Sequence, residues 1–181
     1  MKKTILALAF IGAATLSFAQ KRVTTSAIIQ FDASTSIDEL PKAENKTVIA
    51  AIDPVKGTVQ FEAAMKNFAF KNPMMQDHFN SKNWMNSDEH PKATFSGQIR
   101  NLDAVNFNKD GNYTATVEGI LSIKGKENKV TAPATIIVKA GVITANTEFS
   151  IKLADYGIEG APIAAGKVAK EPKIIVSAEM K

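Results

Sequence analysis

Hydrophobic and polar residues alternate in segment after segment of this chain, which predicts a protein built mainly of β-strands. In the clearest case, residues 113–124, every second position from Tyr113 to Ile123 is apolar or glycine. Turn-forming residues separate the segments, as in residues 53–57, where proline presets φ and glycine allows a positive φ. The expected strands cover residues 25–33, 48–52, 59–65, 93–99, 113–124, 130–138, 143–153 and 174–180.

Residues 61–95 depart from this pattern and gather large apolar side chains. They hold five of the ten Phe, the only Trp and four of the six Met. Asn72-Pro73 is typical of a helix start, because Asn caps the first turn and proline at the first helical position leaves no needed N–H missing. Met75 and Phe79 then lie four residues apart on one helical face. We therefore expect a short apolar helix between the third and fourth strands.

The sequence also indicates where this insertion begins and ends. The alternation changes parity between Met65 and Phe68, which predicts a β-bulge near Asn67. Pro91 disfavours helical geometry at the preceding residue, so the chain should return to a strand there.

Eight strands joined mainly by short turns favour antiparallel neighbours and can close into a barrel without exposed edges. A β-sandwich stays an alternative, because counting strands does not exclude it. The inner rows mix bulky residues with many small ones: Ala27, Ala50, Ala63, Gly97, Ala115, Gly119, Ala132, Ala134, Ala145 and Ala178. Large and small residues could interlock to fill the barrel, or the small ones could leave an apolar cavity with room for one ligand.

The first residues have the features of a secretory signal peptide. Lys2 and Lys3 precede an apolar run, and Ser17 and Ala19 are the small residues expected before a cleavage site. Cleavage after Ala19 would leave a single domain of residues 20–181 outside the cytoplasm, most simply in a bacterial periplasm. The chain has no Cys, so this exported domain would be held together by its core and not by disulfides.

Composition and motifs offer little chemistry. The formal charge is +4 and the Lys residues are scattered, which argues against nucleic-acid binding. His78 and His90 are the only imidazoles, and with their neighbouring carboxylates they match no familiar metal-site spacing. No nucleophile elbow, phosphate-binding loop or dinucleotide fingerprint is present. We therefore predict no enzyme activity, no metal site and no cofactor.

Several motifs, taken together, resemble the YceI-like family. The family pattern "D-H-L … F-F-D … Y-P-x-x-x-F" is similar to Asp77-His78-Phe79, Trp84-Met85-Asn86 and residues 89–95. Its "G-x-L-x-I-x-G … V" hairpin resembles residues 119–125 with Val130. Residues 149–151 and 155–158 resemble its penultimate strand and the loop that follows. The chain departs from the family in lacking the His-Ser pair near the first strand and in having Leu153 where an Arg is common.

This resemblance implies a lipocalin-like eight-stranded antiparallel barrel that holds a polyisoprenoid chain, such as an isoprenoid quinone, in the periplasm. It also implies transient contact with a membrane or a membrane-bound cytochrome. The alternative is a structural or stress-related interaction module with a solid barrel. The oligomeric state, the length of the lipid and its head group stay open.

A binding site for an apolar chain would be lined by the inner rows and the helical insertion. The Asp155–Glu171 connection, with Gly157, Gly160, Pro162 and Gly166, is a candidate gate. Met suits such a site because its thioether adapts to an irregular chain. The residues predicted to bind the lipid are Phe31, Phe61, Met65, Phe68, Met75, Phe79, Trp84, Phe95, Val117, Leu121, Phe149 and Ile151.

Overall fold

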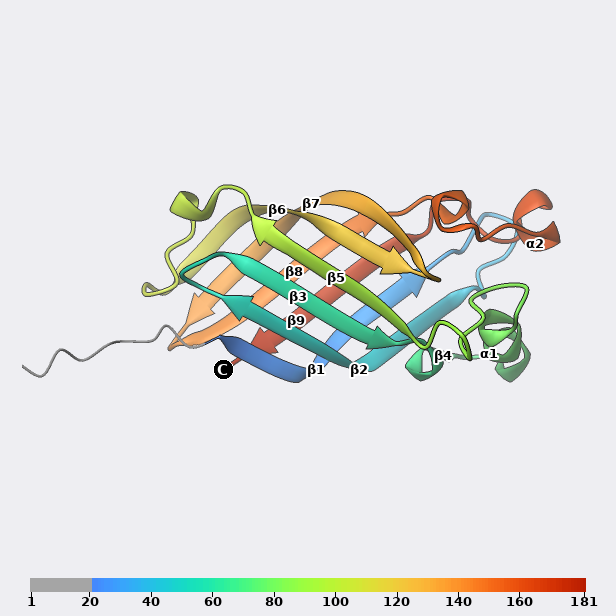
Figure 1. The fold of residues 1–181 in the computed structure, drawn as a ribbon, viewed down its shortest axis with the longest axis horizontal. Helices are drawn as coiled ribbons and strands as arrows, with labels where there is room; N and C mark the ends of the chain where they lie inside the picture. Colours follow the sequence, from blue (N-terminus) through green and yellow to red (C-terminus); the bar gives the residue numbers. More distant parts are fainter. Residues whose placement is uncertain (1–20) are drawn as a thin grey trace, which may run out of the picture.

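Eight long antiparallel strands form a closed barrel, as the alternation predicts (Figure 1). The computed structural model describes residues 21–181, so the predicted signal peptide lies outside the described residues. Around the barrel the order is β1-β9-β8-β7-β6-β5-β3-β2, and β2 pairs again with β1. The strands are β1 (Arg22–Asp32), β2 (Lys42–Asp53), β3 (Thr58–Ala64), β5 (Lys92–Ile99), β6 (Gly111–Ile123), β7 (Lys126–Lys139), β8 (Val142–Ser150) and β9 (Lys173–Met180). Closure decides the fold against a sandwich.

Two hairpins turn within two residues. Lys124-Gly125 joins β6 to β7 with φ values of 51° and 70°, and Ala140-Gly141 joins β7 to β8 with φ values of 49° and 80°. Two positive φ values in succession are those of the tight turn whose twist matches that of the strands, and glycine at the second position tolerates this geometry without strain. The first turn is therefore tighter than the sequence analysis expected, since it had left residues 125–129 between the two strands.

The second strand is longer than predicted and begins at Lys42. The first half of this strand does not follow the alternation of apolar and polar residues, because Asn45 is polar yet fully buried. Its amide donates to the Ala64 carbonyl (2.9 Å), and its Oδ1 accepts from both the backbone N–H and the hydroxyl of Thr47 (2.9 Å each). An irregularity in the pairing with β1 lies at the same place, so Asn45 stabilises a kink that interrupts the simple alternation.

The parity change near Asn67 is a 3-10 turn, η1 (Met65–Asn67), and the predicted β-bulge is wrong. The Phe68 N–H donates to the Met65 carbonyl (3.2 Å), which turns the chain across to β2. There the two-residue strand β4 (Ala69–Phe70) pairs with the start of β2.

The predicted helix is present as α1 (Pro73–Asn80), after β4 and before β5. Asn72 is the N-cap, accepting a hydrogen bond from the Met74 N–H (2.9 Å), and Pro73 occupies the first turn. Both features confirm the interpretation of Asn72-Pro73. None of the helices within residues 21–181 is long and apolar enough to cross a membrane.

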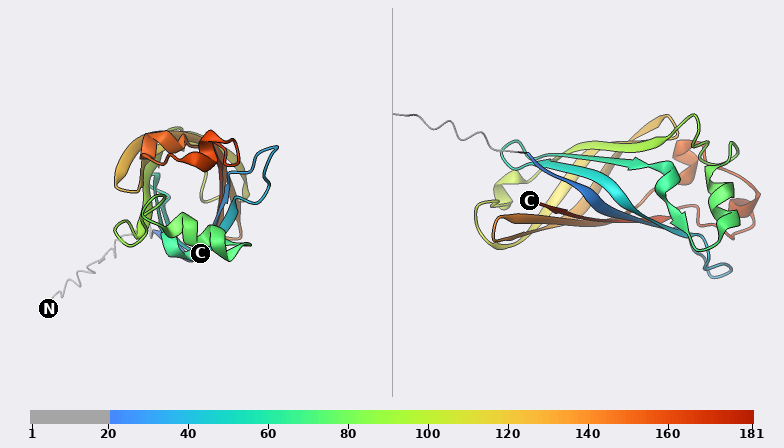
Figure 2. Two further views of the ribbon diagram at one scale, coloured as in Figure 1. Left: turned by 90° about the vertical axis from the view of Figure 1, so that its right-hand side faces the viewer. Right: turned by 90° about the horizontal axis from the view of Figure 1, so that it is seen from below.

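The two ends of the barrel are closed differently. At one end, the turn end, lie the Asp53–Gly57 turn, the connection that contains η2 (Leu102–Ala104), and the turn at Ala140-Gly141. At the other, the cap end, lie α1, η3 (Leu153–Tyr156), α2 (Ala161–Ala164) and the β1–β2 connection. Figure 2, left, looks along the barrel and shows α1 (green) and α2 (orange-red) at opposite rims of the cap end.

Candidate ligand-binding cavity

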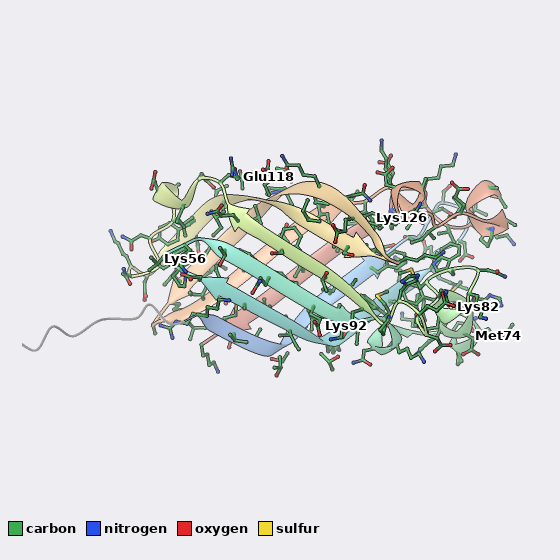
Figure 3. All side chains as sticks on the ribbon, viewed as in Figure 1. Lys56, Met74, Lys82, Lys92, Glu118 and Lys126 are labelled. Atoms are coloured by element: carbon green, nitrogen blue, oxygen red, sulfur yellow. The ribbon has the colours of Figure 1, made fainter. Side chains whose placement is uncertain are left out.

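An apolar cavity of about 150 Å³ runs inside the barrel toward the cap end. Nearly all of its lining is carbon and sulfur from the inner rows of the strands, as the alternation requires. Charged side chains lie outside, as Figure 3 shows for Lys56, Lys92 and Glu118. The inner-row residues around the cavity include Ile29, Phe31, Ile52, Val59, Phe61, Ala63, Ala93, Phe95, Val117, Leu121, Ile123, Val130, Ala132, Ala134, Ile136, Ala145, Thr147, Phe149, Ile174, Val176 and Met180.

Phe79 is the centre of the cap-end lining. Its ring lies 5.0 Å from that of Phe70, 5.9 Å from Phe68 and 6.2 Å from Phe31, measured between centroids and all tilted. Tilted aromatic pairs at these distances attract each other beyond their burial. One residue of α1 thus joins the helix to β1 and to the segment after β3, which fixes the helix over the barrel.

The segment that follows β8 completes this end. Leu153 and Ile158 line the cavity, and Tyr156 is buried beside them with 1% of its surface exposed. Burial raises the pKa of the Tyr156 hydroxyl, and the charge of Asp155 raises it further against a hydrogen bond with Asn128. The folded protein therefore favours the neutral Tyr156 hydroxyl over the charged phenolate.

The candidate gate, Asp155–Glu171, has a fixed part and an exposed part. The Ile158 N–H donates to the Leu153 carbonyl of η3 (3.0 Å), and the Ala169 N–H donates to the Ala33 carbonyl just after β1 (2.8 Å), so both flanks are held by backbone hydrogen bonds. Residues 159–162, between them, are exposed. Gating by this segment stays a prediction.

Eleven of the twelve residues predicted to bind the lipid lie around one cavity. Met75 does not line it, although it shares a helical face with Phe79. It is only half-buried, and its neighbour Met74 is 67% exposed at the far end of the molecule (Figure 3). Whether the other eleven contact a ligand stays a prediction.

The sequence analysis did not select Met85, Leu153 and Ile158, which come from connections at the cap end. Leu153 could have been found, because it continues the every-second-residue row that begins at Ile143. Met85 and Ile158 follow no strand period, and only the folding of their loops brings them to the cavity.

Small residues leave space in part of the barrel and not in another. Gly97 and Gly119 pair directly across β5 and β6, and the Phe95 ring lies over both. A Cβ built on either glycine would come within 2.7 Å of Cζ of that ring. These glycines therefore accommodate Phe95, whereas Ala132, Ala134 and Ala145 border the cavity.

Neither of the two imidazoles lines the cavity. His78 is exposed on α1, and His90 lies against Gly125 in the β6–β7 turn, so neither lines it. The Thr147 hydroxyl, in the lining, donates to the Pro133 carbonyl (2.6 Å). Among the described residues no buried side-chain nitrogen or oxygen lacks a partner, and no group of three His, Asp or Glu is placed to hold a metal ion.

A model of the YceI-like domain matches residues 13–180 of this chain. The chain belongs to the YceI-like family. Solved structures agree on the fold of this YceI-like protein. BcnA of Burkholderia cenocepacia is 21% identical, with a TM-score of 0.69 over 86% of this chain and 96% of that one. A polyisoprenoid binding domain from Saccharophagus degradans, implicated in plant cell wall breakdown, is 11% identical, with a TM-score of 0.74 over 89% and 97%.

A curated relative shares part of its sequence. The probable ADP-ribosylation factor GTPase-activating protein AGD14 of Arabidopsis thaliana is 26% identical over 140 residues, which is 76% of this YceI-like chain. The chain spans about a fifth of that protein, 21% of its length.

Proposed function

We propose that this YceI-like protein binds an elongated apolar lipid, of the polyisoprenoid or isoprenoid-quinone type, inside its barrel and carries or stores it without chemical change. The observation that supports this most directly is the continuous apolar cavity bordered by Phe, Met and Ala. The polyisoprenoid-binding domain of Saccharophagus degradans, which has the same fold, supports the class of ligand.

The energetics favour a chain over a compact polar molecule. Each buried CH₂ contributes roughly 0.8 kcal/mol, so one five-carbon isoprene unit would contribute on the order of 3 to 4 kcal/mol before ordering costs. A few units are enough for micromolar affinity. Among the described residues no buried side-chain nitrogen or oxygen lacks a partner that a head group could satisfy, so recognition rests mainly on shape and burial.

The size of the cavity limits how the lipid is held. At about 150 Å³ it is smaller than the roughly 300–1,000 Å³ of typical small-molecule sites. A dry apolar space of this size accepts small apolar groups, and a longer chain requires the lining to move or part of the ligand to lie outside. Met65 and Met85 at the cap end can adapt by rotating flexible side chains.

Location and function are linked in this proposal. The predicted signal peptide would place the protein in the periplasm, where a lipid carrier would meet the membrane only transiently. The full-length chain, expressed in a bacterium, should therefore be found in the periplasmic fraction. N-terminal sequencing should show that it has been cut after Ala19. An uncut protein in the cytoplasmic fraction would contradict this part.

Organic extraction of the purified protein followed by mass spectrometry tests carriage directly. We expect a co-purifying prenyl lipid, or saturable binding of an added prenyl quinone measured by quenching of Trp84, the only Trp. Neither result would be obtained with a solid structural module, which is the rival function. Replacing both His78 and His90 should leave lipid binding intact, because neither lines the cavity.

A further inference from the structure

We infer that the apolar ligand passes into and out of the barrel sideways, through a gap in the wall between β7 and β8. This inference rests on the proposed function and adds the route that the ligand takes. The β7–β8 ladder ends at the pair Ala134–Thr147. Its neighbours do not end there: β7 stays paired with β6 back to Lys126, and β8 stays paired with β9 on to Ser150.

Pro133 explains why the ladder stops. It lies in the middle of β7, opposite Thr116 of β6. Its carbonyl accepts from the Thr147 hydroxyl (2.6 Å), so the carbonyl faces β8, and in a strand the amide nitrogen of the same residue faces the same way. Proline has no N–H to donate there and is tolerated in sheets where a strand is an edge. From Pro133 back toward its start, β7 is therefore an edge toward β8.

The gap has two defined ends. Thr147 and Pro133 close one end by the hydrogen bond just described. At the other end the Asn128 amide donates to the Asp155 carbonyl of η3 (3.1 Å). Within residues 21–181, the four β7 residues between these closures, Lys129–Ala132, have no ladder partner on the β8 side. In Figure 1 the beginning of β7 bows outward over this part of the barrel.

Two charged side chains beside the gap form ion pairs with the strand on the side away from the gap. Lys129 of β7 forms an ion pair with Glu118 on β6 (3.2 Å), and Glu148 of β8 forms one with Lys173 on β9 (2.8 Å). Lys129 and Glu148, one on each edge, are therefore paired to the strand on the far side of the gap's edge and not across the gap. A ligand that separates β7 from β8 would break neither pair.

The gap opens onto the cavity. Val130 and Ala132 on its β7 side and Phe149 and Ile151 on its β8 side all line the cavity, and Val130 and Phe149 are only half-buried. An apolar chain crossing here would exchange contacts with these side chains. The small cavity gives a reason for such a route, because part of a long ligand could extend through the gap.

A second interrupted seam argues the same point by contrast. The β1–β9 ladder begins only at Ile28–Ser177, so the first residues of β1 lack a partner on β9. None of the β1 residues 22–27 beside that seam lines the cavity, and of the β9 residues beyond Ser177 only Met180 does. At the β7–β8 gap, by contrast, cavity-lining residues stand on both sides.

The absence of Cys from the chain allows a direct test by stapling. Continuing the register from Ala134–Thr147 places Thr131 opposite Ser150, both exposed on the outer face. The variant T131C/S150C would be folded first and then cross-linked with a short bismaleimide. The matched control, I137C/T144C, joins an existing ladder pair on the same two strands, where the wall is already closed.

Stopped-flow quenching of Trp84 by a prenyl quinone gives the rates. We expect the T131C/S150C staple to slow association and dissociation by the same factor, at least about tenfold, and to leave the equilibrium affinity unchanged, because it alters only the path. The control staple should change neither rate. Pro133→Val, which restores an N–H facing β8, should slow both rates partially without any linker.

Two results would overturn the inference, and they are distinguishable. Quinone rates that are the same with and without the T131C/S150C staple would show that the ligand uses another route, such as the cap end, while leaving lipid binding intact. No quinone binding to the unmodified protein would defeat the proposed function, and the route with it.

Discussion

The turn end and the cap end of the barrel are built from the same strands, yet they are closed in different ways. At the turn end, short connections bring Val138 and Ile143 together as closely packed core that does not line the cavity. At the cap end, long connections place aromatic and thioether side chains over the open barrel. Tight turns allow neighbouring rows to interlock, whereas an insertion covers the end without filling it.

The difference also separates stability from binding. Residues of the turn end contribute to the free energy of unfolding through close packing on all sides. Residues of the cap end have the cavity on one side, so they contribute less packing and more of the surface that a ligand would contact. Substitutions of the same type in the two regions should therefore have different consequences.

The largest effect should come from shortening a buried isoleucine at the turn end. Ile143 and Ile158 are both 2% exposed, but only Ile158 lines the cavity. We expect Ile143→Ala to lower the free energy of unfolding by about 3 kcal/mol, within the usual 2–5, and Ile158→Ala to cost nearer about 2 kcal/mol. Denaturant unfolding measures both.

Quinone binding should respond in the opposite order. Ile158→Ala changes the cavity lining and should alter affinity for the prenyl quinone, whereas Ile143→Ala should not. An affinity that changes more in Ile143→Ala would remove the distinction between the two ends.

Enlarging an alanine gives the next largest effect and sharpens the comparison. Ala115 is fully buried outside the cavity, whereas Ala132 lines it. Ala115→Phe should overpack the barrel and lower the free energy of unfolding by about 1–3 kcal/mol. Ala132→Phe should place its ring in the cavity, cost less stability and reduce quinone uptake, as measured by Trp84 quenching. Equal binding by both variants would indicate that the cavity is not the site.

The smallest effect concerns the pH dependence of the cap end. Burial raises the pKa of Asp32, but hydrogen bonds from Ser34 and the nearby Lys42 outweigh it and hold the pKa below its ordinary value of 3.8. A lowered carboxyl pKa in the folded state stabilises the protein above the unfolded-state value, and this stabilisation is lost as the pH falls through the folded-state value. We therefore expect thermal stability to fall below about pH 4.

Asp32→Asn isolates this contribution. The variant keeps the shape of the side chain but cannot titrate, so it should be less stable than the parent at neutral pH and lose less stability on acidification. Thermal midpoints at a series of pH values measure both. An identical pH profile in the two proteins would show that the Asp32 interactions add no net stability.

Strand identity and the facing of side chains follow from the sequence, because alternation is a local property of each segment. This is why eleven predicted residues surround one cavity, and why Asn72-Pro73 marks the start of a helix correctly. Local patterns fail where a buried polar group meets its partners from distant segments, as Asn45 does with Ala64. They also fail at residues 65–67, where a parity change has more than one structural solution.

Only the tertiary structure decides which small residues leave space. Gly97 and Gly119 belong to the same kind of inner row as Ala132, but the Phe95 ring covers the glycines while nothing fills the volume beside the alanine. Likewise, Pro133 is visible in the sequence, but the gap between β7 and β8 depends on register across the barrel. The facing of a side chain is set by its own strand, whereas empty volume depends on side chains from every strand and both ends at once.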